Sequence, residues 1–245
     1  MHEMILLVST SVPAILGLGF FLGLKHATEA DHLAAVTTIV QRNDSILHSA
    51  YVGGLWGLGH TISLFAAGIL VLLLDFQISE RTERGLEFCV GLMLTILGLN
   101  VFRRLLKGGR LHFHQHEHGS LTHVHPHIHE PAEDAELGHH HHVGVSPRPL
   151  FIGMVHGMAG SAALMLLVIP TIDSRTIGLL YVLIFGIGSI GGMMLMSLIV
   201  SLPFRLTASR FQRTNQILQF AAGIVSVTLG LWIVYEKGFS ENLFG

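Results

Sequence analysis

The sequence predicts an all-α membrane protein with about six transmembrane helices. Half of its 245 residues are hydrophobic and only 12% are charged, whereas a soluble domain has about 25% charged residues. The apolar residues also come in long continuous blocks. Such a chain lacks the charged side chains that cover a water-facing surface, which excludes an ordinary soluble domain.

Six apolar blocks are long enough to cross a hydrocarbon core, which takes about 20 residues of helix. They lie at residues 4–24, 50–74, 86–102, 150–170, 177–202 and 216–235. Apolar character resumes at 33–40, and a stretch from 4 to 40 is too long for one straight helix. Pro13 and nearby glycines permit a bend or a break there, so a seventh, short helix near 33–40 is the alternative.

Two pairs of short motifs indicate a 3+3 repeat. Gly23-Leu24-Lys25-His26 resembles Gly153-Met154-Val155-His156, and Trp56-Gly57-Leu58-Gly59-His60 resembles Phe185-Gly186-Ile187-Gly188-Ser189. Because three spans is an odd number, two such halves must be inverted, as in many transporters; chance recurrence of Gly-x-Gly is the alternative. We expect a first half at 1–105, a histidine-rich loop at 106–149 and a second half at 150–245.

Charge and cysteine content indicate how the chain is oriented in the membrane and which partners and cross-links are excluded. With six spans, the loops on one side carry four Lys and Arg residues and those on the other carry nine. The positive-inside rule then places both termini outside and the 106–149 loop in the cytoplasm of a bacterial cell. A net charge of −2 argues against nucleic acid as a partner, and the single cysteine excludes an internal disulfide.

One polar cluster interrupts the apolar sequence, at Lys25-His26-Ala27-Thr28-Glu29-Ala30-Asp31-His32. A charged side chain inside the membrane costs about 2.5–3.5 kcal/mol and usually faces a cavity or a partner. On a regular helix, His26, Glu29 and His32 share one stripe and Asp31 lies off it; if the helix breaks here, Asp31 can join them. Imidazole and carboxylate together suit nickel, cobalt, copper and zinc. The alternative is a helix end whose charges are simply solvated.

Two further histidines, His60 and His156, lie in other apolar blocks beside glycines that permit close helix approach. We take both as candidate metal ligands; for each, the alternative is an interhelical hydrogen bond. Five polar side chains in the apolar blocks are predicted to form interhelical hydrogen bonds rather than to bind an ion: Thr61, Ser63, Asn100, Ser161 and Ser189.

The segment 103–149 contains twelve of the eighteen histidines and little that could form a core. Its composition is typical of a disordered tract that chelates divalent metal weakly at many points. We interpret it as a metal buffer or sensor, with a solvated linker as the alternative. The chain has no Walker phosphate-binding motif, so it is not expected to hydrolyse ATP.

These motifs resemble the signatures of the nickel/cobalt transporter family. The run from His26 to His32 is similar to its His-x4-Asp-His signature, and Leu58-Gly59-His60-Thr61 is similar to its second motif. The likeness is closest to the short, urease-accessory-type transmembrane members. It implies that His26, Asp31 and His32 bind the transported ion and that His60 lies on or near its path. Glu29 stands where longer members usually have Asp.

The resemblance implies a transporter and not an enzyme, with Ni²⁺ or Co²⁺ as substrate, uptake as its direction and no organic cofactor. Membrane lipid, a second copy of the chain and nickel-enzyme maturation proteins are the candidate partners. The alternatives are efflux through the same site, a metal sensor or insertion partner without transport, and an intramembrane metalloenzyme. The sequence argues against a metalloenzyme, because it contains no His-Glu-x-x-His motif and no clear nucleophile beside the cluster.

Overall fold

The computed structural model describes residues 12–40, 45–106, 112–118, 121–127, 146–159, 174–208, 211–241 and 243. Most of these residues are helical, and two short strands pair with each other. The helices are α2 (Val12–His26), α3 (Ala30–Val40), α4 (Ile46–Leu73), α5 (Glu80–Leu106), α6 (Arg148–Gly157), α8 (Arg175–Ala208) and α9 (Gln212–Tyr235). A π-helical segment, η2 (Glu236–Ser240), continues α9, and the strands are β1 (His112–His118) and β2 (Leu121–His127).

Four of the described helices are long and apolar enough to cross a membrane: α4, α5, α8, and α9 with η2. They coincide with four of the predicted apolar blocks, and the prediction of an all-α membrane protein is confirmed. The blocks at 4–24 and 150–170 extend beyond the described residues, so the count of six spans stays a prediction. The alternative of a short helix near 33–40 is confirmed, because α3 is a separate helix of 11 residues.

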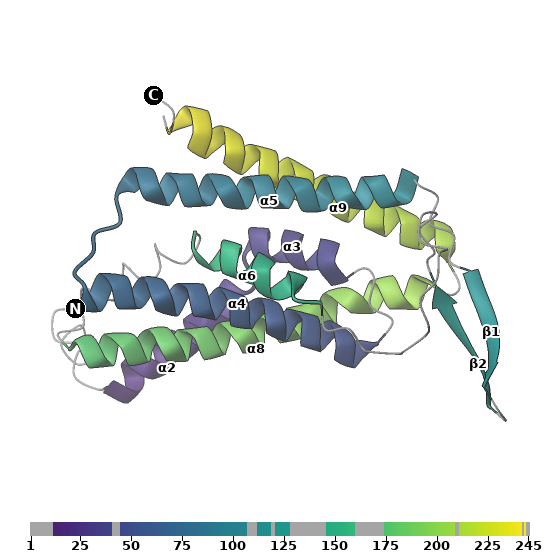
Figure 1. Cartoon of the computed structure of the whole chain (residues 1–245), viewed down its shortest axis with the longest axis horizontal. Helices are drawn as coiled ribbons and strands as arrows, with labels where there is room; N and C mark the ends of the chain where they lie inside the picture. The colour runs from purple at the N-terminus through teal and green to yellow at the C-terminus, as the bar shows by residue number, and fades with distance from the viewer. Residues whose placement is uncertain are drawn as a thin grey trace, which may run out of the picture.

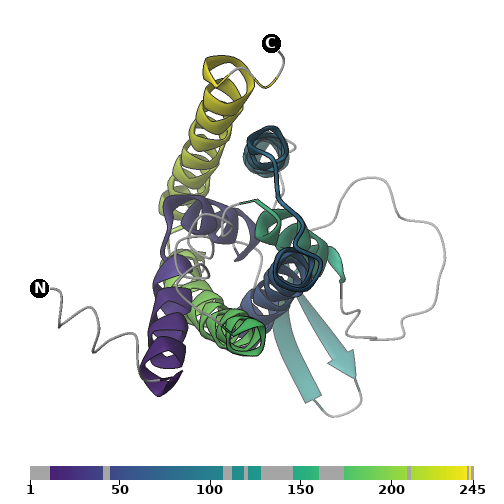
Figure 2. The same cartoon turned by 90° about the vertical axis from the view of Figure 1, so that its left-hand side faces the viewer.

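The helices form two groups with two short helices between them (Figures 1 and 2). In the first group α8 packs against both α2 and α4, and in the second α5 packs along α9. The short helix α6 lies on α4, and α3 contacts α8, α9 and α5. The ends of α3 and α6 therefore lie in the interior of the bundle.

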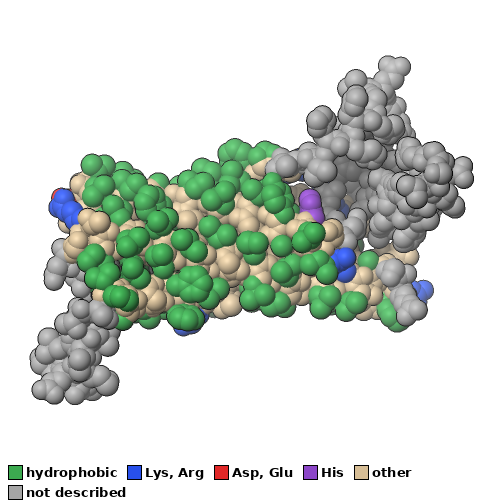
Figure 3. Space-filling model, turned by 90° about the horizontal axis from the view of Figure 1, so that it is seen from below, with side chains coloured by type: hydrophobic (Ala, Val, Ile, Leu, Met, Phe, Trp, Pro, Cys, Tyr) green, Lys and Arg blue, Asp and Glu red, His purple; other side chains and the backbone are tan. Residues whose placement is uncertain are grey.

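The outer surface is apolar and the interior contains many polar groups. Large hydrophobic side chains cover the flank of the bundle, with Lys and Arg at its two ends (Figure 3); Phe21, Leu195 and Trp232 are among the exposed ones. Within the described ranges, the buried polar side chains are His26, His32, Thr38, Ser49, His60, Thr61, Ser63, His156, Ser189, Ser197, Ser201, Asn215 and Ser226. In a bilayer, polar side chains that face inward mark hydrogen-bonded helix contacts and binding sites.

Glycines let helix backbones touch where the helices cross. In the α5–α9 pair, a Cβ on Gly91 would meet the backbone of Gly230, and one on Gly98 would meet the backbone of Gly223. Between these two contacts the Ser226 hydroxyl donates to the carbonyl of Leu94 at 2.8 Å. Close backbone approach of this kind is a main source of helix association in lipid, where hydrophobic burial contributes little.

The histidine-rich segment differs from the predicted disordered tract in the part that is described. β1 pairs antiparallel with β2, with His112 opposite His127 and His118 opposite Leu121. Strand pairing satisfies backbone N–H and C=O groups without an apolar core, so a polar composition does not prevent it. The prediction of disorder is wrong for these two strands; the rest of 107–145 lies outside the described residues.

Candidate metal centre

The polar cluster lies where α2 ends and α3 begins. α2 ends at His26, α3 begins at Ala30, and residues 27–29 form a turn. The Thr28 hydroxyl and the Thr28 backbone N–H both donate to the carbonyl of Lys25, at 2.6 and 2.9 Å. Such local side-chain bonds compete with helix continuation. Of the two alternatives for residues 26–32, the regular helix is therefore wrong and the broken helix is confirmed.

Four histidines from four helices meet in the interior. His26 ends α2, His32 lies in the first turn of α3, His60 is near the middle of α4, and His156 lies near the end of α6. All four are fully buried. The ring centres of His26 and His32 are 4.3 Å apart, those of His32 and His156 are 4.1 Å apart, and those of His26 and His60 are 5.1 Å apart.

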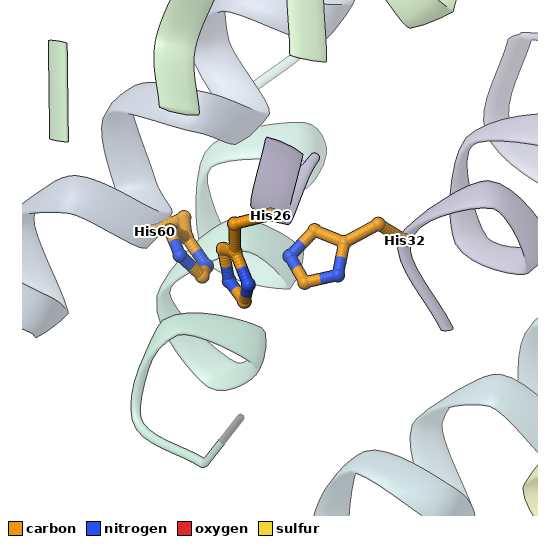
Figure 4. Close-up of side chains that lie close together, drawn as sticks. All are labelled: His26, His32 and His60. Carbon is orange, nitrogen blue, oxygen red and sulfur yellow. The ribbon is translucent and has the colours of Figure 1, made fainter. Parts of the chain in front are cut away.

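Their donor atoms form two overlapping groups with the spacing of a metal site. His26, His32 and His60 bring one nitrogen each within 4.8 Å of the others, and so do the ligand atoms of Asp31, His32 and His156. Figure 4 shows the first group, with the ring of His32 entering from the opposite side to His60 and one of its nitrogens toward His26. Nitrogens bound to one ion at about 2.0–2.1 Å lie within about 4 Å of one another, so small side-chain movements complete a site.

Most of the ring nitrogens have no hydrogen-bond partner within the described part of the chain. These are both nitrogens of His26, both of His60, Nε2 of His32 and Nδ1 of His156. A buried polar atom left without a partner costs about 1–3 kcal/mol. A cluster of such atoms in one place is the arrangement expected of a site whose missing partner is a bound ion.

Two carboxylates border the histidines. Asp31 Oδ1 lies 2.9 Å from Nδ1 of His32, and Asp31 Oδ2 lies 3.0 Å from Nε2 of His156. Glu29 Oε2 lies 3.1 Å from Nδ1 of His26, but that contact lacks the geometry of a hydrogen bond. The Asp31 side chain is 21% exposed and that of Glu29 is 41% exposed. The structure thus brings all six predicted site residues together, with the carboxylates at the edge.

Close helix contacts fix the positions of His60 and His156. A Cβ on Gly59 would meet the carbonyl of Leu150, and one on Gly157 would meet the backbone of His60, so α4 and α6 are in backbone contact here. The Ser63 hydroxyl donates to the carbonyl of Met154 at 2.8 Å.

Two predicted hydrogen bonds join α8 to α4 and to α2. The Thr61 hydroxyl donates to the carbonyl of Gly186 at 3.1 Å, and the Ser189 hydroxyl donates to that of Gly23 at 3.3 Å. Together with the Ser63 bond, they confirm the interhelical hydrogen bonds predicted for these three side chains. The Leu58-Gly59-His60-Thr61 motif of α4 therefore lies between α8 on one side and α6 on the other, and hydrogen bonds join α4 to both helices.

Trp56 belongs to the site although its role was not predicted from the sequence. Its ring centre lies 5.5 Å from that of His32 and 5.7 Å from that of His156, and its Nε1 has no partner among the described residues. Trp56 is four residues before His60 on α4, and residues spaced by four share a helix face. That spacing is the sequence signal that places Trp56 beside the ligands.

The comparisons with known proteins agree with the motifs. The chain is 37% identical over 232 residues to the urease accessory protein UreH of Bacillus sp. (strain TB-90), covering 94% of this chain and 95% of that protein. It is 26% identical over 241 residues to the chloroplast protein FOR GROWTH AND FERTILITY 2 of Arabidopsis thaliana, covering 97% of this chain and 60% of that protein. A 118-residue stretch is 27% identical to the high-affinity nickel transport protein of Cupriavidus necator, covering 40% of this chain and 34% of that protein.

No protein-family model and no solved structure matches the chain. The bacterial relatives are by name an accessory protein and a transport protein. The match to UreH covers nearly the whole of both proteins. The chain therefore belongs to the family of the urease accessory protein UreH, as expected for a short, urease-accessory-type relative of the nickel/cobalt transporters.

Proposed function

We propose that the protein transports nickel, or else cobalt, across a bacterial cytoplasmic membrane, with uptake into the cytoplasm as the direction. The observation that carries the proposal is the group of fully buried histidines, six of whose ring nitrogens have no hydrogen-bond partner among the described residues. Neutral imidazole is a good ligand for nickel and cobalt. Placed inside an apolar bundle, these nitrogens replace the water that the ion loses on leaving solution.

The names of the relatives support the choice of metal. The Cupriavidus relative is named for high-affinity nickel transport, and the Bacillus relative for an accessory role to urease. The site contains no thiolate, since Cys89 is exposed and lies outside it, and its nitrogen donors suit Ni²⁺ and Co²⁺ better than soft Cu⁺. We therefore include nickel-enzyme maturation proteins among the proposed partners.

The proposed architecture has two inverted halves of three spans each, residues 1–105 and 150–245, joined by the 106–149 loop on the cytoplasmic side, with both termini outside. Equivalent contacts in the two halves support it. A Cβ on Gly23 would meet the carbonyl of Phe185, and one on Gly153 would meet the carbonyl of Trp56. Gly23 and Gly153 hold the same place in the first motif, as Trp56 and Phe185 do in the second.

In the proposed mechanism the ion is held by His26, His32 and His60, while Asp31 and Glu29 supply negative charge. His156 reaches the same site from the second half. Movement of one half against the other then exposes the ion to the opposite side, as in other proteins built from inverted repeats.

A transport assay with purified protein in liposomes tests the proposal. Nickel uptake is expected, with competition by cobalt stronger than by zinc. His32→Ala is expected to abolish uptake, because His32 belongs to both donor groups. His48→Ala is the matched control, because His48 lies exposed at the start of α4. Equal uptake by wild type and His32→Ala, with the protein correctly inserted, would contradict the proposal.

The direction of transport is tested in cells. If the protein takes up nickel, its loss lowers the activity of nickel enzymes at limiting nickel. If it exports nickel through the same site, its loss instead lowers nickel tolerance. The two outcomes are opposite, so one pair of growth and activity measurements distinguishes them.

A further inference from the structure

Both oxygens of the Asp31 carboxylate are occupied by hydrogen-bond donors. Oδ1 accepts the backbone N–H of His32 at 2.9 Å and lies 2.9 Å from Nδ1 of the same histidine. Oδ2 lies 3.0 Å from Nε2 of His156. Asp31 and His32 come from α3 and His156 from α6, so this one side chain joins two helices that are far apart in the sequence.

These contacts determine which nitrogen of each ring carries the proton. An ionised carboxylate only accepts hydrogen bonds, so the ring nitrogens that face it must be N–H donors. A neutral imidazole has a single N–H. Its lone pair is then left on Nε2 in His32 and on Nδ1 in His156. These same two atoms have no hydrogen-bond partner in the part of the chain that the structure describes.

We propose, on the basis of the metal-transport function proposed above, that Asp31 is a positioning residue and not a ligand. It holds His32 with Nδ1 protonated and His156 with Nε2 protonated, and so sets opposite tautomers in two neighbouring rings. The ion then meets ready lone pairs on nitrogen. Histidines that bind metals generally donate their other N–H to a carboxylate or carbonyl in this way.

The occupied state of the carboxylate favours this role over direct coordination. Oδ1 already accepts two donors of His32, so an ion bound there would displace one of them, and an ion bound at Oδ2 would have to share that oxygen with the N–H of His156. As a positioning residue, Asp31 keeps all three bonds when the ion arrives. Its negative charge is still close enough to offset part of the charge of the cation.

The tautomers are measured directly by NMR on the full-length, metal-free protein with ¹⁵N-labelled histidine. Wild type is expected to show His32 protonated at Nδ1 and His156 protonated at Nε2. In Asp31→Asn one amide oxygen still accepts, but the amide NH₂ now donates to the other ring, which must switch its tautomer. His32 protonated at Nε2 in wild type, or unchanged tautomers in Asp31→Asn, would overturn the proposal.

Metal spectroscopy gives a second, independent readout. Asp31→Asn is expected to bind nickel about 10- to 100-fold more weakly, while X-ray absorption shows the same number of imidazole ligands as in wild type. His32→Ala should lose one imidazole, and Asp75→Asn, in an exposed ion pair with Arg175, should bind nickel like wild type. Loss of an oxygen ligand in Asp31→Asn would overturn the proposal. A protein with these tautomers that moves no nickel in liposomes would instead refute the transport function.

Discussion

Two helix crossings, each between a helix of the first half of the chain and one of the second, have similar backbone contacts and different chemistry. Where α4 crosses α6, a Cβ on Gly59 would meet the carbonyl of Leu150. Where α8 crosses α2, a Cβ on Gly188 would meet the carbonyl of Phe20. The two glycines occupy the same position in two similar motifs, and they make equivalent contacts at the two crossings.

The two crossings differ in the residue that follows each glycine. His60 follows Gly59 and has two ring nitrogens without a partner in the described residues, whereas Ser189 follows Gly188 and donates its hydroxyl to the carbonyl of Gly23. The serine hydroxyl forms a hydrogen bond between two helices. The ring nitrogens of the histidine form none with the described residues, which leaves them able to bind a metal ion. The glycines therefore serve helix packing at both crossings. The metal-binding chemistry is unevenly divided, because three of the four clustered histidines come from the first half of the chain.

Substitution at these two positions should separate binding from packing, with the largest effect at His60. His60→Ser is expected to weaken nickel binding by more than the roughly 10- to 100-fold that loss of a supporting group causes. Ser189→Ala removes one hydrogen bond and should cost about 1 kcal/mol of stability with nickel affinity unchanged. Titration calorimetry and thermal unfolding of the purified variants measure the two quantities. Equal nickel affinity in both variants would remove His60 from the site.

The glycines should respond alike, because both crossings need them. Gly59→Ala and Gly188→Ala each place a methyl group against a backbone carbonyl, and overpacking of this kind costs about 1–3 kcal/mol. Gly17→Ala is the control, because no described atom beyond its chain neighbours and the nearby backbone of its own helix lies within 4 Å of the added methyl, and alanine there should stabilise α2 by about 0.5–1 kcal/mol. Thermal unfolding in detergent tests all three. A loss at Gly59 with none at Gly188 would contradict the equivalence of the two crossings.

The sequence predicts the spans and the repeated motifs because both depend on local pattern. Hydropathy places α4, α5, α8 and α9, since a hydrocarbon core demands long apolar helices. The glycines of each motif are visible as Gly-x-Gly, and the structure explains them as backbone contacts.

The arrangement inside the site depends on choices that local pattern does not decide. A continuous helix and a helix broken at 27–29 differ by a few side-chain hydrogen bonds, such as those of Thr28, so the sequence alone left Asp31 on or off the site. The bond from His156 to Asp31 joins residues 125 positions apart. The packing of α6 against α4, together with the contacts of α3 with α8, α9 and α5, brings the two together.

The two carboxylates at the edge of the site provide the finest comparison and the smallest expected effect. Asp31 makes three short contacts and is 21% exposed, whereas Glu29 makes one contact, at 3.1 Å to Nδ1 of His26, and is 41% exposed. Water screens the more exposed charge, and the poor hydrogen-bond geometry leaves the tautomer of His26 less constrained.

Glu29→Gln should therefore weaken nickel binding by less than about 10-fold, below the range that supporting groups usually cost. Asp31→Asn, measured in the same titration, sets the scale, because an amide can accept from only one of the two rings that the Asp31 carboxylate holds. A loss in Glu29→Gln equal to or greater than that in Asp31→Asn would make His26, and not His32, the histidine whose orientation limits binding. The turn at 27–29, which places Glu29 against His26, would then be the main determinant of affinity.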